Sequence, residues 1–154
     1  MKKWIIFALL WTIPLFSAEG KRDYFTQLTP QEAKDIQFIV TTLGNTSAVG
    51  LLFKKSALEK AGDRIGQVHP LRFFGYVMSH PQLKASFANI KGMAWNNFED
   101  GMVGSLKKAD SRNNLNAEMV NDFARQSHLD ASTVQGFVKH KQWKQLIAFV
   151  RKQA

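Results

Sequence analysis

One stretch, residues 68–83, constrains the fold of this chain more than any other. It reads VHPLRFFGYVMSHPQL, so two His-Pro dipeptides bracket about ten residues that are almost all apolar. Leu71, Phe74 and Met78 recur at the spacing of one helical face, and Phe73 lies on a second face. A short helix that is apolar on most sides has to be surrounded by other elements. The stretch therefore predicts a buried central helix with amphipathic segments packed around it.

Each His-Pro dipeptide also predicts the start of a helix. Proline fits the first helical turn, because the N–H group that it lacks would have no intrahelical partner there. We therefore expect Pro70 and Pro81 to open two successive helices, with His69 and His80 at the helix boundaries.

The first helix of the chain's main domain has the clearest start signal. Thr29, Pro30 and Glu32 have the spacing of a capping box with proline in the first turn. Gly44 follows the last apolar residue of this helix, and we expect it to end the helix in a left-handed turn. A second helix is expected from about residue 47 to residue 61, carrying the apolar run VGLLF.

Helical periodicity continues to the C-terminus. Ser132 and Gln135 repeat the capping-box spacing, and the polar run at residues 109–115 is expected to be a flexible loop. No segment alternates between apolar and polar residues for long enough to indicate a strand. We predict one all-α domain of about seven short amphipathic helices over residues 29–154, preceded by a lead-in segment at residues 21–28.

Residues 1–20 differ in composition from the rest. A basic start precedes an apolar run at residues 4–16, and small residues follow, which is the order of a secretory signal peptide. The alternative is a membrane anchor, but the run contains Pro14 and is shorter than the roughly 20 residues that span a bilayer. We expect cleavage after Ala18 or Gly20 and no transmembrane segment in the remaining chain. The protein would then be periplasmic or secreted, and the Met-Lys-Lys start of the signal peptide resembles that of bacterial proteins.

The charge balance is strongly basic. The 154 residues carry a formal net charge of +9, which becomes +8 when residues 1–20 take away two lysines and one glutamate. This balance favours acidic partners, such as an acidic protein, an anionic lipid surface or nucleic acid. The chain has no cysteine, which excludes disulfides and lipid attachment through a cysteine. An exported chain of this kind has to obtain its stability from its core.

Arg72 is the one charged residue near the middle of the predicted central helix. A guanidinium group does not lose its charge, so it has to reach water or pair with a carboxylate. We expect a structural ion pair with Glu99 or Asp100, and Asp63 is a further candidate. The alternative is an anion-binding arginine in a pocket. Glu99 and Asp100 diverge by about 100° on a helix, which does not suit a pair of catalytic carboxylates.

The two histidines of the His-Pro dipeptides do not indicate a metal site. If a helix runs between them, His69 and His80 lie about 16 Å apart, too far to share one ion. No HExxH motif, paired cysteines or calcium loop completes a site. A haem group is compatible with an all-α chain that has spare histidines, but compatibility is weak support. We predict helix-boundary histidines, no metal and no cofactor.

The C-terminal segment is the best candidate for an interaction surface. Its basic cluster has almost no acids nearby and consists of Lys139, His140, Lys141, Lys144, Arg151 and Lys152. The alternative is a solvated cationic face over a core-facing Trp143. Because Trp143 lies on the apolar stripe, it is not available to stack on bases, so an acidic protein or an anionic envelope surface fits better than nucleic acid.

Three functional hypotheses follow. The first is a small exported helical protein that works without catalysis, by contact with another macromolecule. The second is an enzyme or small-ligand carrier with a site around Arg72, the nearby acids and His69 or His80. The third is a binder of nucleic acid or another anionic polymer through the C-terminal basic cluster. No nucleophile motif or phosphate-binding loop supports the enzyme hypothesis.

Overall fold

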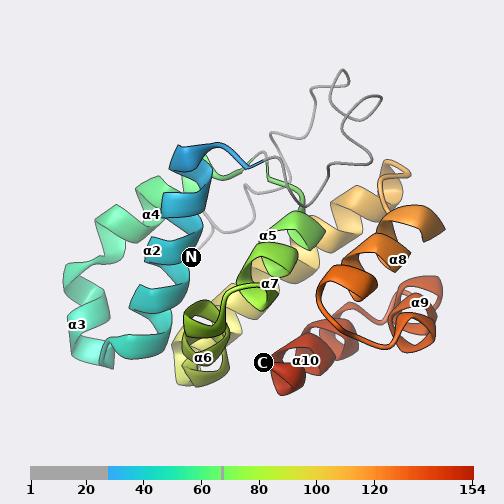
Figure 1. Ribbon diagram of the computed structural model, residues 1–154. Coiled ribbons are helices and arrows are strands. Elements are labelled where there is room, and N and C mark those ends of the chain that lie inside the picture. The colour runs from blue at the N-terminus through green and yellow to red at the C-terminus, as the bar shows by residue number, and fades with distance from the viewer. Residues whose placement is uncertain (1–27, 67) are drawn as a thin grey trace.

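Nine α-helices and no strand make up the described part of the chain, residues 28–66 and 68–154 of a computed structural model (Figure 1). The all-α prediction is confirmed, with more helices than the expected seven. The expected signal peptide and residues 21–27 lie outside the described residues. The helices are α2 (Pro30–Asn45), α3 (Ala48–Phe53), α4 (Lys55–Arg64), α5 (Pro70–Met78), α6 (Pro81–Asn89), α7 (Gly92–Ser111), α8 (Ala117–Gln126), α9 (Ala131–Lys139) and α10 (Trp143–Gln153).

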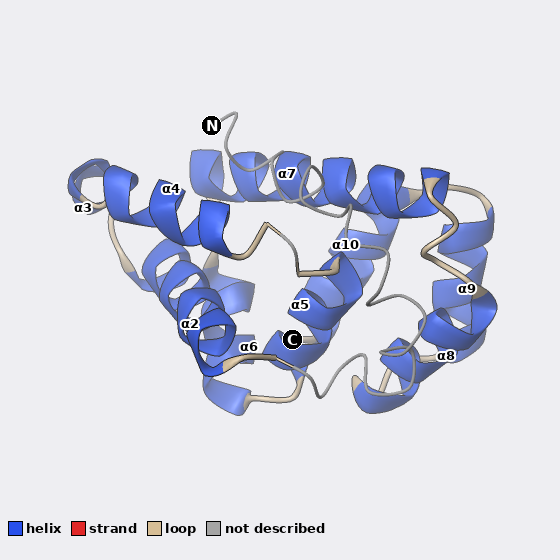
Figure 2. Cartoon of the chain, turned by 90° about the horizontal axis from the view of Figure 1, so that it is seen from above, coloured by secondary structure: helices blue, strands red, loops and turns tan. Residues whose placement is uncertain are grey.

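The predicted central helix is α5. Both views place α2, α3 and α4 on one side of the molecule and α8 and α9 on the other, with α5 between them (Figures 1 and 2). Helix α5 contacts α2, α6, α7 and α8, and seven of its nine residues are buried. The prediction of a buried central helix is therefore confirmed. None of the described helices combines the length and the apolar composition needed to cross a membrane.

Four phenylalanine rings join α5 to its neighbours. Phe73 and Phe74 of α5 meet Phe87 of α6 and Phe98 of α7, and all four side chains are buried. Ring centroids of the contacting pairs lie 5.7 to 6.3 Å apart, in tilted or edge-to-face arrangements. Such pairs add roughly 0.5–1.5 kcal/mol each beyond the burial of their area. This aromatic cluster fixes α5, α6 and α7 relative to one another.

His69 caps α5 from inside the core. Its Nδ1 accepts a hydrogen bond from the backbone N–H of Leu71 at 3.0 Å, so its proton is on Nε2 and is donated to the carbonyl oxygen of Asn114 at 2.8 Å. Burial lowers the pKa of His69 to about 3. The other dipeptide starts α6, where His80 is the exposed N-cap residue. Both histidines lie at helix boundaries, as predicted.

The polar run at residues 109–115 is not the long flexible loop that the sequence suggested. Helix α7 continues through Ser111, and the chain then turns at Asn113, whose φ is 59°. Leu115 is buried, and the Asn114 carbonyl accepts the hydrogen bond from His69. The segment is a tight turn anchored to the central helix.

Two of the helix signals have a different role from the one predicted. Helix α2 continues past Gly44 to Asn45, and Gly44 does not have a positive φ, so the expected left-handed turn is wrong. A Cβ at Gly44 would lie 2.1 Å from the carbonyl oxygen of Ser86, so this glycine allows α2 and α6 to approach closely. Helix α9 is capped by Asp130, whose side chain accepts from the N–H of Thr133, and not by Ser132.

The close approach of α2 and α6 leads to a stability prediction. We expect Gly44→Ala to lower the free energy of unfolding by about 1–3 kcal/mol, because the new methyl group meets backbone that cannot rotate away. Urea unfolding measures the change. Gly136→Ala in α9 is the matched control: a Cβ there meets nothing within 4 Å, so helix propensity predicts a gain of up to about 1 kcal/mol. Equal effects of the two substitutions would contradict this account of the α2–α6 contact.

The buried His69 leads to a prediction about pH. The pKa of His69 is about 3 in the folded chain against 6.5 for the free side chain. Between these values the unfolded chain binds more protons, so the contribution of His69 is complete above about pH 6.5 and is lost as the pH falls. We expect His69→Asn, which keeps a capping acceptor, to reduce the pH dependence of the unfolding free energy in that window by about 1.4 kcal/mol per pH unit.

Urea unfolding at several pH values between 4 and 7 tests this prediction. His80→Asn is the matched control, because His80 is the cap of the next His-Pro helix and is exposed. This variant keeps His69, so the loss of stability that His69 causes below about pH 6.5 should remain. A His69→Asn variant with an unchanged pH dependence would show that His69 is not held neutral in the core.

Candidate functional site

Four large apolar side chains are exposed next to one another in sequence or space. Val49, Leu52 and Phe53 belong to α3, and Met93 lies at the start of α7. Their exposed fractions are 65%, 73%, 86% and 77%. We call these four residues the apolar edge. Exposed apolar side chains that gather in one place indicate an interaction site, whereas scattered ones do not.

The local sequence explains why α3 stays exposed. Ser47 caps this helix by accepting a hydrogen bond from the N–H of Gly50 at 3.1 Å, and the helix ends after six residues at Lys54. Successive residues point about 100° apart around a helix, so a continuous apolar run cannot face the core with every side chain. Leu51 packs against the core, and α3 contributes no fully buried residue.

The helix that the sequence predicted for residues 47–61 is therefore two helices. The break at Lys54 separates α3 from α4, and it turns most of the VGLLF run away from the core. The sequence predicts a helix for this run but does not indicate which of its side chains are buried. No local signal separates this run from a core segment, because a short helix that is apolar on most sides is also typical of a buried one.

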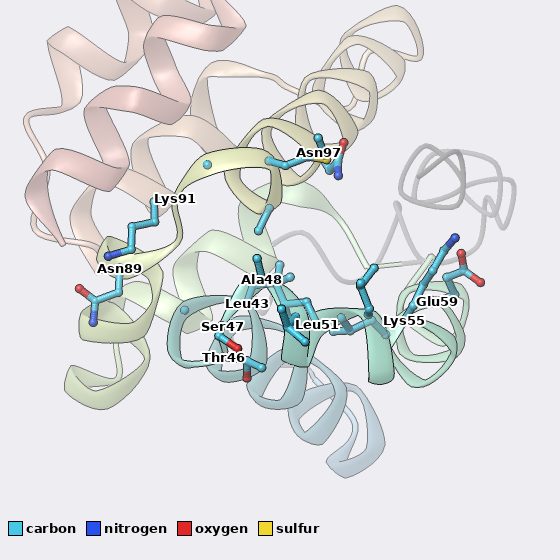
Figure 3. Close-up of a pocket in the computed structure, with 17 residues that line it drawn as sticks. Leu43, Thr46, Ser47, Ala48, Leu51, Lys55, Glu59, Asn89, Lys91 and Asn97 are labelled. Carbon is cyan, nitrogen blue, oxygen red and sulfur yellow. The ribbon is translucent and has the colours of Figure 1, made fainter.

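An apolar groove of about 670 Å³ lies beside the apolar edge (Figure 3). One wall comes from the end of α2, from α3 and from the start of α4. The other wall comes from the link between α6 and α7 and from the first turns of α7. The buried side chains of Leu43 and Leu58 line it, together with the half-buried Leu51. The volume is within the range of pockets that bind small ligands.

Lysines border both the groove and the apolar edge. Lys55 and Lys91 line the groove, and Figure 3 shows them toward its opposite ends, with Glu59 near Lys55. Lys54 follows Phe53 directly and is exposed. Among the described residues, none of these three lysines has an ion-pair partner. The surroundings of the apolar edge are therefore predominantly cationic.

Arg72 and its two predicted partners, Glu99 and Asp100, differ in their burial and in their neighbours. Arg72 is half-buried, and its charge adds to the burial that lowers the pKa of His69. Glu99 is half-buried near Arg151, whose pKa is lowered by burial while the Glu99 charge opposes that change. Asp100 is exposed. The pairing of Arg72 with Glu99 or Asp100 stays a prediction.

An ion pair that the sequence analysis missed joins α2 to α4. The Arg64 guanidinium donates to Asp35 through Nε at 2.9 Å and through Nη2 at 2.7 Å. The Asp35 side chain is only 4% exposed, and Gln31 also donates to it. These residues are 29 positions apart, so only the packing of the two helices brings them together.

The predicted C-terminal basic cluster is divided between solvent and structural contacts. Exposed members of the cluster that have no ion-pair partner among the described residues are Lys139, His140, Lys144 and Lys152. Lys141 is also exposed, and its Nζ lies 3.2 Å from Oδ2 of Asp110. Trp143 is buried, as the prediction of a core-facing tryptophan requires.

Arg151 is the member of this cluster that is committed to the fold. Its guanidinium carbon lies 3.9 Å from the centroid of the Trp95 ring, in a cation–π contact. The same group donates hydrogen bonds to the carbonyl oxygens of Ile90 and Ala88. Arg151 therefore ties α10 to the end of α6, and it is less available to a partner than the four exposed members.

The second hypothesis placed a catalytic or ligand site around Arg72, His69 and His80. Both ring nitrogens of the buried His69 are engaged in hydrogen bonds, so this residue has no free nitrogen for a substrate or a metal. His80 lies on the surface, where its ring packs on Tyr76 with centroids 4.2 Å apart. Within residues 28–66 and 68–154, no three His, Cys, Asp or Glu side chains form a group that could hold a metal ion.

The chain resembles proteins named as lipoproteins in three species of Chlamydia. It is 25% identical over 131 residues to a probable lipoprotein of Chlamydia pneumoniae, and 28% identical to an uncharacterized lipoprotein of Chlamydia muridarum and to a probable lipoprotein of Chlamydia trachomatis. Each match covers 84% of this chain, which spans about 60% of the length of these curated relatives. No solved structure is significantly similar.

The similarity extends over the whole helical domain. A family model matches residues 28–153, from just before α2 through the end of α10, and includes the apolar edge and the groove. The family is described as one of unknown function. By this match, the chain belongs to the family of unknown function DUF8085.

Proposed function

We propose that this chain is an exported, non-enzymatic protein of the bacterial cell envelope that binds an anionic membrane surface through the apolar edge. The observation that carries the proposal is the exposure of Val49, Leu52, Phe53 and Met93 at 65% to 86% on one side of the domain. Burying such side chains below the headgroups of a bilayer gains about 25 cal/mol per Å² of apolar surface. The exposed apolar side chains of the apolar edge are therefore suited to insert a short distance into the surface of a bilayer.

The lysines around the edge support an anionic surface in particular. Lys54, Lys55 and Lys91 are exposed beside the apolar side chains. A lysine near a membrane of anionic lipids contributes about 1 kcal/mol to binding. Apolar insertion and electrostatic attraction then act on the same face, and stable attachment requires two such contributions.

The N-terminal sequence and the relatives support a place in the envelope. The order of charges and apolar residues in residues 1–20 is typical of an export signal. The relatives in Chlamydia are named as lipoproteins, and this name supports a location at the cell envelope for the present chain. A chain held at a membrane surface would present the apolar edge to lipid at high local concentration.

A second candidate function is contact with an acidic protein through the C-terminal basic cluster. The exposure of Lys139, His140, Lys144 and Lys152 favours it. This surface has no exposed large apolar side chain among the described residues, because those of the domain lie at the apolar edge. It therefore offers charge alone, which is screened by salt within about 10 Å at 0.1 M.

Vesicle binding of charge-matched variants distinguishes the two surfaces. In the full chain, the triple variant Lys54→Gln, Lys55→Gln, Lys91→Gln removes three charges at the apolar edge. We expect it to bind vesicles of phosphatidylglycerol and phosphatidylcholine about 100-fold more weakly at low salt, from about 1 kcal/mol per lysine. Co-sedimentation with the vesicles measures the partition coefficient. The variant Leu52→Ser, Phe53→Ser should also bind at least about tenfold more weakly.

The matched control is Lys139→Gln, Lys144→Gln, Lys152→Gln, which removes the same charge from the C-terminal cluster. We expect it to reduce binding by no more than about threefold, because its charges lie away from the inserted edge. The segment at residues 1–27 is common to all variants, so it does not contribute to their differences. Equal losses in the two triple variants, or a chain that dimerises through the apolar edge in sedimentation velocity, would contradict the proposal.

A further inference from the structure

We infer that the groove beside the apolar edge binds the acyl chain of a single anionic lipid drawn from the membrane surface. This inference rests on the proposed function, because that function brings the mouth of the groove to the bilayer. The edge would then serve both to attach the domain and to bring a lipid within reach of the groove.

The lining of the groove matches a flexible hydrocarbon chain. Its apolar lining residues are aliphatic apart from Met93, and no aromatic ring contributes to the lining. Leu43 and Leu58 are buried, and Leu51 is half-buried. Every polar residue of the lining is exposed or half-buried, so no deep hydrogen-bonding group is present to orient a polar ligand. Pockets for polar ligands combine an apolar lining with a few precisely placed polar groups. This groove has the apolar lining alone.

The mouth of the groove favours an anionic headgroup. Lys55 and Lys91 belong to its lining and are exposed, and Glu59 is the one acid there. Figure 3 shows the two lysines at separate ends, so a headgroup leaving either end would meet a positive charge. The N-terminus of α7 lies at the same wall, where Gly92 and Met93 line the groove, and a helix N-terminus adds to the attraction for negative charge.

The groove is continuous with the apolar edge, so an acyl chain can pass from the bilayer into the groove along apolar side chains. Val49, Leu52 and Met93 belong both to the apolar edge and to the lining. An acyl chain that leaves the bilayer beside these side chains can enter the groove without crossing water. A soluble carrier that takes its ligand from solution does not need its entrance to be the most exposed apolar surface of the molecule.

Titration with a monomeric lipid tests the inference without a bilayer. The probe is lysophosphatidylglycerol with a 12-carbon chain, kept below its critical micelle concentration, and isothermal titration calorimetry measures binding to the full chain. We expect saturable binding of one lipid. Affinity should rise about tenfold for each two carbons between the 8-, 10- and 12-carbon chains, because each buried CH₂ adds a constant increment, until the groove is filled.

Two comparison ligands identify the recognised chemistry. Lysophosphatidylcholine with the same chain should bind about tenfold more weakly, and this difference should disappear in Lys55→Gln, Lys91→Gln. Free dodecanoate has the same chain length but carries a carboxylate in place of the phosphoglycerol headgroup. Comparing its affinity with that of lysophosphatidylglycerol shows which anionic group the groove prefers. Tighter binding of dodecanoate than of lysophosphatidylglycerol would overturn a membrane lipid as the ligand.

Variants that fill the groove provide the structural control. Ala48 and Ala94 line it, and Ala48 is exposed at the first position of α3, so Ala48→Phe does not disturb the core. We expect Ala48→Phe and Ala94→Phe to weaken lysophosphatidylglycerol binding at least about tenfold. The matched control is Ala148→Phe at an exposed position of α10, which should bind like the natural chain. Circular dichroism confirms that each variant is folded.

The outcomes separate this inference from the proposed function. If Ala48→Phe loses lysophosphatidylglycerol but still binds anionic vesicles, both stand. If the chain binds vesicles through the apolar edge but shows no saturable binding of the monomeric lipid, the groove is not a lipid site and only the inference is overturned. If the folded groove-filling variants bind the lipid like Ala148→Phe, the inference is also overturned. Lipid bound in the groove of a chain that does not bind vesicles would overturn the proposed function and the membrane as the source of the lipid, whereas the groove itself would stand as a lipid-binding site.

Discussion

The burial of α5 through the aromatic cluster is the interaction on which the rest of the structure depends. Phe73 and Phe74 leave α5 on neighbouring faces and meet Phe87 and Phe98 from two other helices. Close-packed interiors leave little free volume, so a core of this kind is filled by its own side chains. Helix α3 lies outside that core: it packs on α4, and Leu51 is the residue of its apolar run that contacts the core.

Much of the fold could be predicted from local sequence. The capping box at Thr29, the two prolines of the His-Pro dipeptides and the apolar periodicity of α5 each correspond to what the structure contains. These signals depend on residues within one or two helical turns. The role of Gly44 and the pairing of Asp35 with Arg64 depend on contacts between distant helices, which local spacing does not contain.

The candidate site was harder to predict, for a related physical reason. Charge clusters can be recognised in a sequence, and the C-terminal basic cluster was therefore predicted as an interaction surface. In the structure, however, Arg151 of this cluster holds α10 against Trp95. An apolar run such as VGLLF looks like core in any sequence. Whether Phe53 is buried depends on where α3 ends and on whether the core has space, and both are settled only when the domain packs.

The depth of Phe53 at a membrane tests the central claim most directly. The chain has no cysteine, so a single cysteine introduced at position 53, 144 or 148 carries one nitroxide label. Electron paramagnetic resonance on anionic vesicles then compares access of oxygen, which concentrates in the bilayer, with that of a water-soluble nickel complex. We expect the label at Phe53 to be shielded from nickel and accessible to oxygen, with the labels at Lys144 and Ala148 in water. A vesicle-bound chain whose label at Phe53 remains in water would contradict the account.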